Sequence, residues 1–233
     1  MDKPLIIIQA RTGSTRLPNK MILNFYKGKT IPEIIIESLK KQFNFSRIVL
    51  ATSKKKEDDE IEKIALKLKI NCFRGDENNV LKRFIDCAET FNATKIIRIC
   101  SDNPFINNKY IKVLSDQIMR NEYEYISYKW NNGEPVMLSH IGVFAESMTL
   151  DFLKKISNFT NKSFYQEHVT NFLYENREFF NFKFLRIPSY LEGKQNIRLT
   201  VDTKEDFNIS KELYKKIMLK SPHFEISDLL NLI

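Results

Sequence analysis

The sequence contains little of what builds disulfide frameworks or membrane spans. Its 233 residues include only three cysteines, and this odd number at wide spacings gives neither a disulfide pattern nor paired metal ligands: Cys72, Cys87 and Cys100. No apolar run approaches the roughly 20 residues that cross a bilayer. The start of the chain lacks a basic stretch followed by an apolar one, so we expect no signal peptide. We therefore expect a cytoplasmic protein in a reducing compartment, without a membrane partner.

The charge is unbalanced toward the basic side. The 37 Lys and Arg against 29 Asp and Glu give a formal net charge of +8. A basic protein can bind nucleic acid, because phosphates attract Lys and Arg. Here the basic residues are spread along the chain, many on amphipathic helical stretches, and no RNA-recognition, zinc-finger or basic-zipper pattern is present. We expect no nucleic-acid partner.

Short apolar, β-branched runs alternate with segments of helical periodicity in the first half of the chain. The patterns predict strands at residues 5–8, 47–51, 71–74 and 95–100, and helices at 31–43, 61–68 and 80–91. This alternation implies right-handed crossovers and an α/β fold with a doubly wound, mostly parallel sheet and helices on both faces. In such sheets ligands bind beyond the carboxyl ends of the strands. The polar loops after Ile8, Ala51 and Cys100 should therefore meet at one rim.

The second half of the chain is less regular. We predict strands at 125–128 and 182–187, and helices at 151–159, 166–176 and 204–218. No internal repeat, low-complexity segment or linker separates the halves. We therefore predict one domain over residues 1–233.

The loop that follows the first strand is rich in phosphate-binding groups. Residues 9–20 contain two arginines, a lysine, three hydroxyls and one of only 6 glycines: Arg11, Thr12, Gly13, Ser14, Thr15, Arg16 and Lys20. Main-chain N–H groups freed at a glycine turn, together with guanidinium forks, suit a triphosphate. The loop lacks the Gly-Lys-Ser/Thr of a Walker A sequence and the three-glycine dinucleotide pattern. The alternative is a solvated basic loop.

Two aspartates follow predicted strands and are candidate metal ligands. Asp102 ends the strand at 95–100, and a carboxylate at that rim can hold Mg²⁺ opposite a phosphate-rich loop. Asp202 ends an alternating stretch at 197–202, which we interpret as a further strand. Residues 203–206 resemble a capping box, so Asp206 should cap a helix and Asp202 is the better metal ligand.

Six segments, in order along nearly the whole chain, carry a family resemblance. They are residues 8–20, 50–53 with Asp58 and Asp59, 73–84, 98–104, 166–170 and 198–206. These segments resemble the cytidylyltransferase family that includes CMP-Kdo and CMP-sialic acid synthetases, and in particular its spore-coat polysaccharide biosynthesis branch. One departure is Asn19, which stands where the family usually has glycine before the lysine.

The resemblance implies a fold and an activity. The fold would be Rossmann-like, of the nucleotide-diphospho-sugar transferase type, with a nucleotide-binding half at about 1–110 and an acceptor and dimerisation half at about 111–233. The enzyme would use Mg²⁺ to transfer CMP from CTP to an acidic sugar or phosphorylated acceptor, releasing pyrophosphate, for a surface polysaccharide. A homodimer is also implied.

The resemblance also implies roles for individual residues. Arg11 and Lys20 would contact the triphosphate and act in catalysis, with Arg16 helping, and Asp102 and Asp202 would hold the catalytic Mg²⁺. Further nucleotide-binding residues would be Gln9, Ala10, Gly13, Ser14, Ser53 and Arg74. Acceptor-binding residues would be His140, Glu146, Glu167 and His168. An ionised acceptor needs no general base, whereas a hydroxyl acceptor would need His140 or His168.

Other functions remain open at this point. GTP or UTP with a sugar 1-phosphate would use the same chemistry. A glycosyltransferase would typically show an Asp-x-Asp motif, which the first half lacks. A degenerate nucleotide-binding protein would be expected to have lost Lys20, Asp102 or Asp202, and all three are present.

Overall fold

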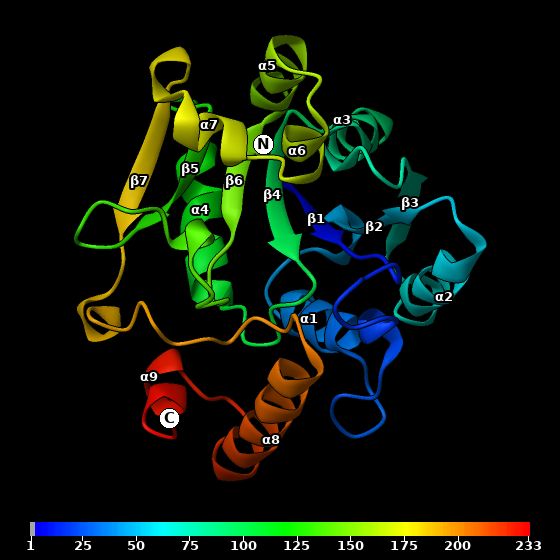
Figure 1. The fold of residues 1–233 in the computed structure, drawn as a ribbon, viewed down its shortest axis with the longest axis vertical. Coiled ribbons are helices and arrows are strands. Elements are labelled where there is room, and N and C mark those ends of the chain that lie inside the picture. Colours follow the sequence, from blue (N-terminus) through cyan, green and yellow to red (C-terminus); the bar gives the residue numbers. More distant parts are fainter. Residues whose placement is uncertain (1–2) are drawn as a thin grey trace.

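One mixed sheet runs through the computed structural model, which describes residues 3–233 (Figure 1). Within these residues the strand order is β3-β2-β1-β4-β6-β5-β7. The strands are β1 (Leu5–Gln9), β2 (Ile48–Ser53), β3 (Asn71–Gly75), β4 (Lys95–Cys100), β5 (Tyr125–Lys129), β6 (Glu146–Thr149) and β7 (Phe182–Arg186). The first four strands are parallel, β6 is antiparallel to both β4 and β5, and β7 is parallel to β5.

Helices cover both faces of this sheet. They are α1 (Ile31–Lys40), α2 (Asp59–Lys67), α3 (Val80–Thr90), α4 (Asn108–Ile118), α5 (Leu150–Phe159), α6 (Ser163–Glu167), α7 (Asn171–Glu175), α8 (Lys204–Lys220) and α9 (Ile226–Leu230). Alternate residues of β1 point to opposite faces: Ile6 and Ile8 join the core under α1, α2, α4 and α8, whereas Leu5 and Ile7 join the core under α3, α5 and α7. The unbroken apolar run of β1 is thus required by burial on both sides. The predicted α/β class, with a mostly parallel sheet between helices, is confirmed.

The second half differs from the prediction in its short elements. The helix expected at 166–176 is two helices, α6 and α7, because Val169 is fully buried and the hydroxyl of Thr170 donates to Glu146 at 2.8 Å. Three elements were not predicted: β6, α4 and α9. Three of the four residues of β6 are polar, so no strand pattern stands out, whereas α4 does bury Tyr110, Ile111, Leu114 and Ile118 at helical spacing.

The strand expected at 197–202 is not a strand. This segment is irregular, with a bend at Thr200, and its amides bond to loops instead of to a strand. Leu199 N–H donates to His140 O at 2.8 Å, and Val201 N–H donates to Asp102 O at 2.9 Å. Asp202 therefore reaches the end of β4 through a loop-to-loop contact, which alternation alone does not reveal.

The helices of residues 3–233 include none with both the length and the apolar character needed to cross a bilayer. The prediction of one domain with two functional halves remains a prediction.

Candidate active site

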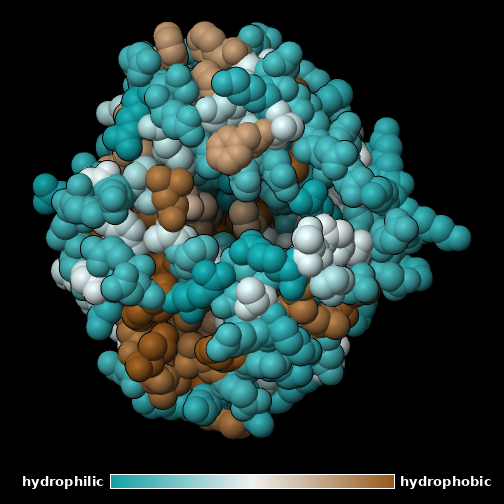
Figure 2. Space-filling model, in the orientation of Figure 1, coloured by the Kyte–Doolittle hydropathy of each residue, from teal (hydrophilic) through white to brown (hydrophobic). Residues whose placement is uncertain are grey.

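The loops that follow β1, β2 and β4 meet at the carboxyl ends of these strands, as the topology predicts. A cavity of about 280 Å³, here called the central pocket, is lined there by residues from the end of β1 and the loop after it, the loop after β4, α6 and the segment before α8: Gln9, Ala10, Arg11, Ser14, Arg16, Lys20, Asp102, Glu167 and Asp202 among them. Figure 2 shows a hollow near the middle of this face, with hydrophilic residues to its right and below it and hydrophobic residues to its left.

Two further cavities adjoin the central pocket. The loop pocket, of about 210 Å³, lies toward the end of β2 and is lined by Gly13, Ser14, Ser53, Asp58 and Glu77, among others. The histidine pocket, of about 280 Å³, shares Asp102 and Asp202 with the central pocket and adds Asn103, His140, Phe144, His168 and Thr200. The site is therefore a row of three pockets, with the two carboxylates at the boundary between the second and the third.

A nearly buried ammonium group lies between the two carboxylates. Lys20 Nζ donates to Val201 O at 2.6 Å and lies 3.5 Å from Asp102 Oδ2 and 3.8 Å from Asp202 Oδ1. Both oxygens of Asp202 are also paired, with Arg16 Nη2 at 2.8 Å and with Arg198 Nη2 at 2.8 Å. The centre therefore concentrates three cationic groups around two anionic ones.

Two carboxylates are too few to hold a metal ion by protein side chains alone, but they suit Mg²⁺ that is also bound by water and substrate. Among residues 3–233 no group of three or more His, Cys, Asp or Glu side chains is placed to hold a metal ion. Mg²⁺ commonly takes one or two carboxylates and completes its octahedron with water and substrate phosphates. Asp102 suits this arrangement, since its carboxylate accepts no hydrogen bond from any described residue and pairs only with Lys20.

A buried carboxylate holds the loop after β1 in place. Asp58 Oδ1 accepts from the amide and hydroxyl of Thr12 at 2.8 and 2.7 Å, and Oδ2 accepts from the amide and hydroxyl of Ser53 at 3.1 and 2.5 Å. Burial raises the pKa of Asp58, but the hydrogen bonds from Ser53 and Thr12 outweigh it, so the pKa lies below its usual value. Asp58 therefore joins the loop to the end of β2.

The departure at Asn19 is explained by the backbone. Asn19 has φ of 61°, in the left-handed region that favours glycine and that asparagine tolerates better than most residues. Its amide donates to Thr12 O at 3.1 Å, so the loop closes on itself directly before Lys20. Asparagine thus preserves the turn that a glycine would make.

Three of the predicted acceptor-binding residues lie at the site. Glu167 Oε1 is 2.6 Å from Arg11 Nη2, at the edge of the central pocket. His140 Nδ1 is 3.3 Å from the hydroxyl of Thr200 and 3.9 Å from Asp202 Oδ2. His168 lines the histidine pocket from the break between α6 and α7.

Glu146 is not placed to bind an acceptor. It is fully buried, lines none of the three pockets, and pairs with Arg98 Nη1 at 2.6 Å while accepting from Tyr125 and Thr170. Arg98 in turn donates to the side chain of Gln9 at 3.3 Å. The role of Glu146 is therefore to fix Arg98 behind the central pocket, because an isolated buried arginine would be costly.

Arg74 is also outside the pockets. Its guanidinium pairs with Asp59 at 2.6 Å and Glu62 at 2.9 Å and donates to the carbonyls of Ser53 and Lys55. With every contact directed at the connection from β2 to α2, Arg74 orders that connection and does not face the nucleotide loop. The other predicted nucleotide-binding residues line the central or the loop pocket: Gln9, Ala10, Arg11, Gly13, Ser14, Arg16, Lys20, Ser53 and Asp102.

Sequence reasoning assigned no role to three residues that shape the site. The sequence does hint at a role for Asp58, since it is an acidic residue in the polar segment that follows the predicted strand at 47–51. Arg83 is fully buried; its Nη1 donates to Asp76 O at 2.6 Å, and its Nε and Nη2 have no partner among the described residues. Burial lowers the pKa of Arg83 to about 10. Arg198 carried no signal, because its pairing with Asp202 depends on the irregular path of residues 197–202.

Comparisons with known proteins agree with this geometry. The sequence profile of the cytidylyltransferase family matches residues 5–226. The spore coat polysaccharide biosynthesis protein SpsF of Bacillus subtilis is 31% identical over 240 residues, covering 100% of this chain and 95% of that protein. An uncharacterized protein of Methanocaldococcus jannaschii is 38% identical over 209 residues, covering 90% and 82% of the two chains.

Solved structures give the same result. A cytidylyltransferase from Leptospira borgpetersenii superposes with a TM-score of 0.85 at 31% identity, covering 99% of this chain and 93% of that one. A CMP:2-keto-3-deoxy-manno-octonic acid synthetase in complex with CTP superposes with a TM-score of 0.67 at 17% identity, covering 92% and 99%, which shows the shared fold. From its sequence profile and its relatives, this chain belongs to the cytidylyltransferase family and is a nucleotidyltransferase.

Proposed function

We propose that the enzyme transfers CMP from CTP, with Mg²⁺, to an acceptor used in polysaccharide biosynthesis. The observation that carries this proposal is the position of Lys20, between Asp102 and Asp202, where the central pocket meets the histidine pocket. The printed names of two relatives support the rest: one is a spore coat polysaccharide biosynthesis protein, and one binds CTP.

The three pockets suit the three parts of the reaction. The triphosphate lies in the central pocket against Arg11, Arg16 and Lys20, with the nucleoside toward the loop pocket and the acceptor in the histidine pocket. An acceptor oxygen attacks the α-phosphorus, the bond from that phosphorus to the bridging oxygen breaks, and pyrophosphate leaves in line. The cationic side chains stabilise the charge on the leaving group. Asp102 and Asp202 would hold Mg²⁺, which supplies Lewis-acid polarisation of the phosphate.

The lining of the histidine pocket bears on the acceptor. No Lys or Arg lines this pocket, whereas Ser139, His140, His168 and Thr200 do, and Asn103 Oδ1 has no hydrogen-bond partner among the described residues. An acidic sugar fits these groups, because its hydroxyls can pair with the amide, hydroxyl and imidazole groups while its anionic group faces the cations of the central pocket. An ionised acceptor oxygen needs no general base; a hydroxyl would use His140 or His168.

Pyrophosphate release tests the proposal. The enzyme is supplied with Mg²⁺, each of the four nucleoside triphosphates in turn, and a panel of acidic sugars and phosphorylated polyols. Release with CTP and one acceptor class is expected, and release with GTP or UTP and a sugar 1-phosphate would replace the CTP assignment.

Asp102→Asn is the matched perturbation. Turnover should fall by about 10² or more, because the variant removes a carboxylate from the metal while leaving its shape. Asp86→Asn, which only breaks an exposed pair with Lys82 on α3, is the control and should retain full activity. Undiminished turnover in Asp102→Asn would show that Asp102 does not hold the metal.

The homodimer and the cytoplasmic location remain part of this proposal. The second half exposes about half of each of three aromatic side chains, Phe159, Phe164 and Phe179, which a second copy could cover. Light scattering across micromolar concentrations should give twice the monomer mass; a monomer at all concentrations would contradict the dimer.

A further inference from the structure

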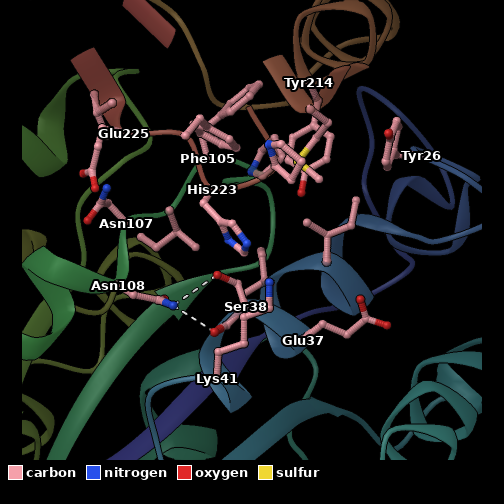
Figure 3. A pocket seen from close by; sticks show the side chains of 18 of the residues that line it. Tyr26, Glu37, Ser38, Lys41, Phe105, Asn107, Asn108, Tyr214, His223 and Glu225 are labelled. Carbon is pink, nitrogen blue, oxygen red and sulfur yellow. Dashed lines mark hydrogen bonds between the residues drawn. The ribbon is translucent and has the colours of Figure 1, made fainter. Parts of the chain in front are cut away.

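A fourth cavity lies outside the site and is larger than any of its three pockets. It has a volume of about 490 Å³ and lies between α1, the loop from β4 to α4, α8 and α9 (Figure 3). Figure 3 shows His223 reaching from the α8–α9 connection toward the side of the cavity where Ser38 and Lys41 lie.

The walls of this cavity are apolar at depth. Ile35, Phe105, Tyr214 and Ile226 line it and are each buried. Phe105 and Tyr214 pack with ring centroids 5.7 Å apart, so the apolar wall is continuous across two elements. A ring or a short aliphatic body could be buried against this wall at a gain of about 25 cal/mol per Å² of apolar surface.

The mouth of the cavity carries uncompensated positive charge. Lys29 pairs with Glu37 at 2.6 Å, and Lys109 pairs with Glu225 at 2.7 Å. Lys27 and Lys41 also line the cavity, and neither has a carboxylate partner among the described residues. Lys27 Nζ lies over the Tyr26 ring, 5.4 Å from its centroid, and the lining therefore carries two lysines whose charge no carboxylate among the described residues compensates.

The cavity is held open by hydrogen bonds between its walls. Asn108 Nδ2, at the start of α4, donates to Ser38 O at 2.8 Å and to Ser38 Oγ at 3.1 Å on α1. These bonds fix the separation of the two helices without any ligand, which lowers the ordering cost of binding.

Three segments of the cavity wall continue directly from the charged centre of the active site. The turn that contains Tyr26 follows Lys20, the loop that contains Phe105 follows Asp102, and α8 begins at Lys204, two residues after Asp202. A ligand that shifted these walls would shift Lys20, Asp102 and Asp202 as well.

We propose that this cavity binds a small molecule with an apolar ring or short chain and one anionic group, a carboxylate or a phosphate, and that its occupancy changes the affinity for CTP. The change in CTP affinity rests on the proposed function, whereas binding in the cavity does not.

Binding is tested with phenyl phosphate on the full-length, ¹⁵N-labelled protein in the absence of nucleotide. Saturable amide shifts are expected for residues of the cavity, such as Tyr26, Ser38 and Asn108. Inorganic phosphate and benzyl alcohol, which each present one half of the probe, should bind at least tenfold more weakly. Phenylacetate separates the two anion types: tighter binding than phenyl phosphate would assign a carboxylate, and weaker binding a phosphate.

The charge at the mouth is tested by the double variant Lys27→Gln/Lys41→Gln, which keeps most of each side-chain stem. Phenyl phosphate should bind about tenfold more weakly to it, since the positive charge of the cavity lining falls by two. Lys216→Gln, an exposed lysine of α8 outside the cavity, makes a single matched charge change and should leave the affinity unaltered. Shifts confined to residues 9–20, shifts that never saturate, or equal affinity in the double variant would overturn the assignment.

The coupling is measured by titrating CTP with and without saturating phenyl phosphate. The dissociation constant of CTP should change at least threefold in the wild type and much less in the double variant. By reciprocity, CTP must change the affinity for phenyl phosphate by the same factor. If CTP binds but neither dissociation constant changes when the other ligand is present, the coupling is refuted. If CTP does not bind at all, the proposed function is refuted, and the cavity assignment is decided by the binding test with phenyl phosphate.

Discussion

The substitution Asp58→Asn tests whether the active-site loop is held by a single buried carboxylate. Asparagine has nearly the same shape, but it replaces one acceptor oxygen by an NH₂ group. That NH₂ would face the donors of either Thr12 or Ser53. The hydroxyl on that side can rotate and accept, whereas the backbone N–H cannot and is left without a partner.

The expected loss follows from these contacts. Hydrogen bonds to a charged group contribute about 1.5–3 kcal/mol each, and a buried donor left unpaired costs a similar amount. We therefore expect the free energy of unfolding to fall by about 2–3 kcal/mol in Asp58→Asn. For a chain of this length, that corresponds to a melting temperature lower by about 4–12 °C. The affinity for CTP should fall as well, because the loop that carries Arg11 and Lys20 is no longer joined to β2.

Urea unfolding, followed by the fluorescence of the buried Trp130, measures the loss, and CTP titration measures the affinity. The pH dependence adds a second test. The folded-state pKa of Asp58 is lowered, so its contribution is fully present above about pH 4 and is lost as the pH falls through the folded-state pKa. The difference between wild type and variant should therefore narrow only in acid.

Asp86→Asn again provides the control, since its pair with Lys82 is exposed and should contribute no more than about 1 kcal/mol. Suppose that the free energy of unfolding of Asp58→Asn at pH 7 lies within about 0.5 kcal/mol of the wild-type value and that the variant binds CTP equally well. The carboxylate would then not hold the loop, and the reasoning would fail.

Three further predictions concern the surroundings of the site. Glu146→Gln should lower the free energy of unfolding by about 3 kcal/mol in urea titrations, because Arg98 loses its buried counter-charge; an unchanged midpoint would contradict this pairing. Gly142 has φ of 62°, and a Cβ added there would lie 3.1 Å from the backbone nitrogen of Thr200. Gly142→Ala should therefore lower the free energy of unfolding by about 1–2 kcal/mol and raise the KM for the acceptor more than the KM for CTP. Equal effects on both KM values would argue against a local distortion. Iodoacetamide should modify Cys72 and Cys87 slowly at pH 8, because burial raises their pKa values to about 11 and about 12, and rapid alkylation of the native protein would refute this.

The parts of the fold that the sequence predicted well are those set by local periodicity. The apolar runs of β1 and β4 require burial on both faces, and their polar ends then mark the rim where Arg11, Lys20 and Asp102 lie. The predicted capping box also holds: Thr203 accepts from the amide of Asp206 at 3.1 Å, and Asp206 accepts from the amide of Thr203 at 2.8 Å.

The parts that sequence reasoning missed depend on contacts between distant segments. The predicted strand at 197–202 satisfies its amides on loops, and the helix at 166–176 breaks because Thr170 reaches a buried glutamate 24 residues away. Glu146 and Arg74 matched a family pattern, yet their charges are neutralised by Arg98 and by Asp59 and Glu62. A pattern of residue types does not say which charge each side chain will meet.

The loops that carry Asp102 and Asp202 are joined by a hydrogen bond between main-chain atoms, and a second bond to the same backbone comes from Lys20. Val201 N–H donates to the carbonyl of Asp102, and the carbonyl of Val201 accepts from Lys20. Neither bond uses the side chain of residue 201. Leu199 and Val201 are buried in the core, whereas Thr200 is partly exposed, so substitutions of Thr200 that keep this backbone path can accumulate without moving the two carboxylates apart. The positions of the two carboxylates thus do not depend on the side chain of Thr200, so the histidine pocket that it lines, which we propose as the acceptor pocket, can change during evolution while the carboxylates stay in place.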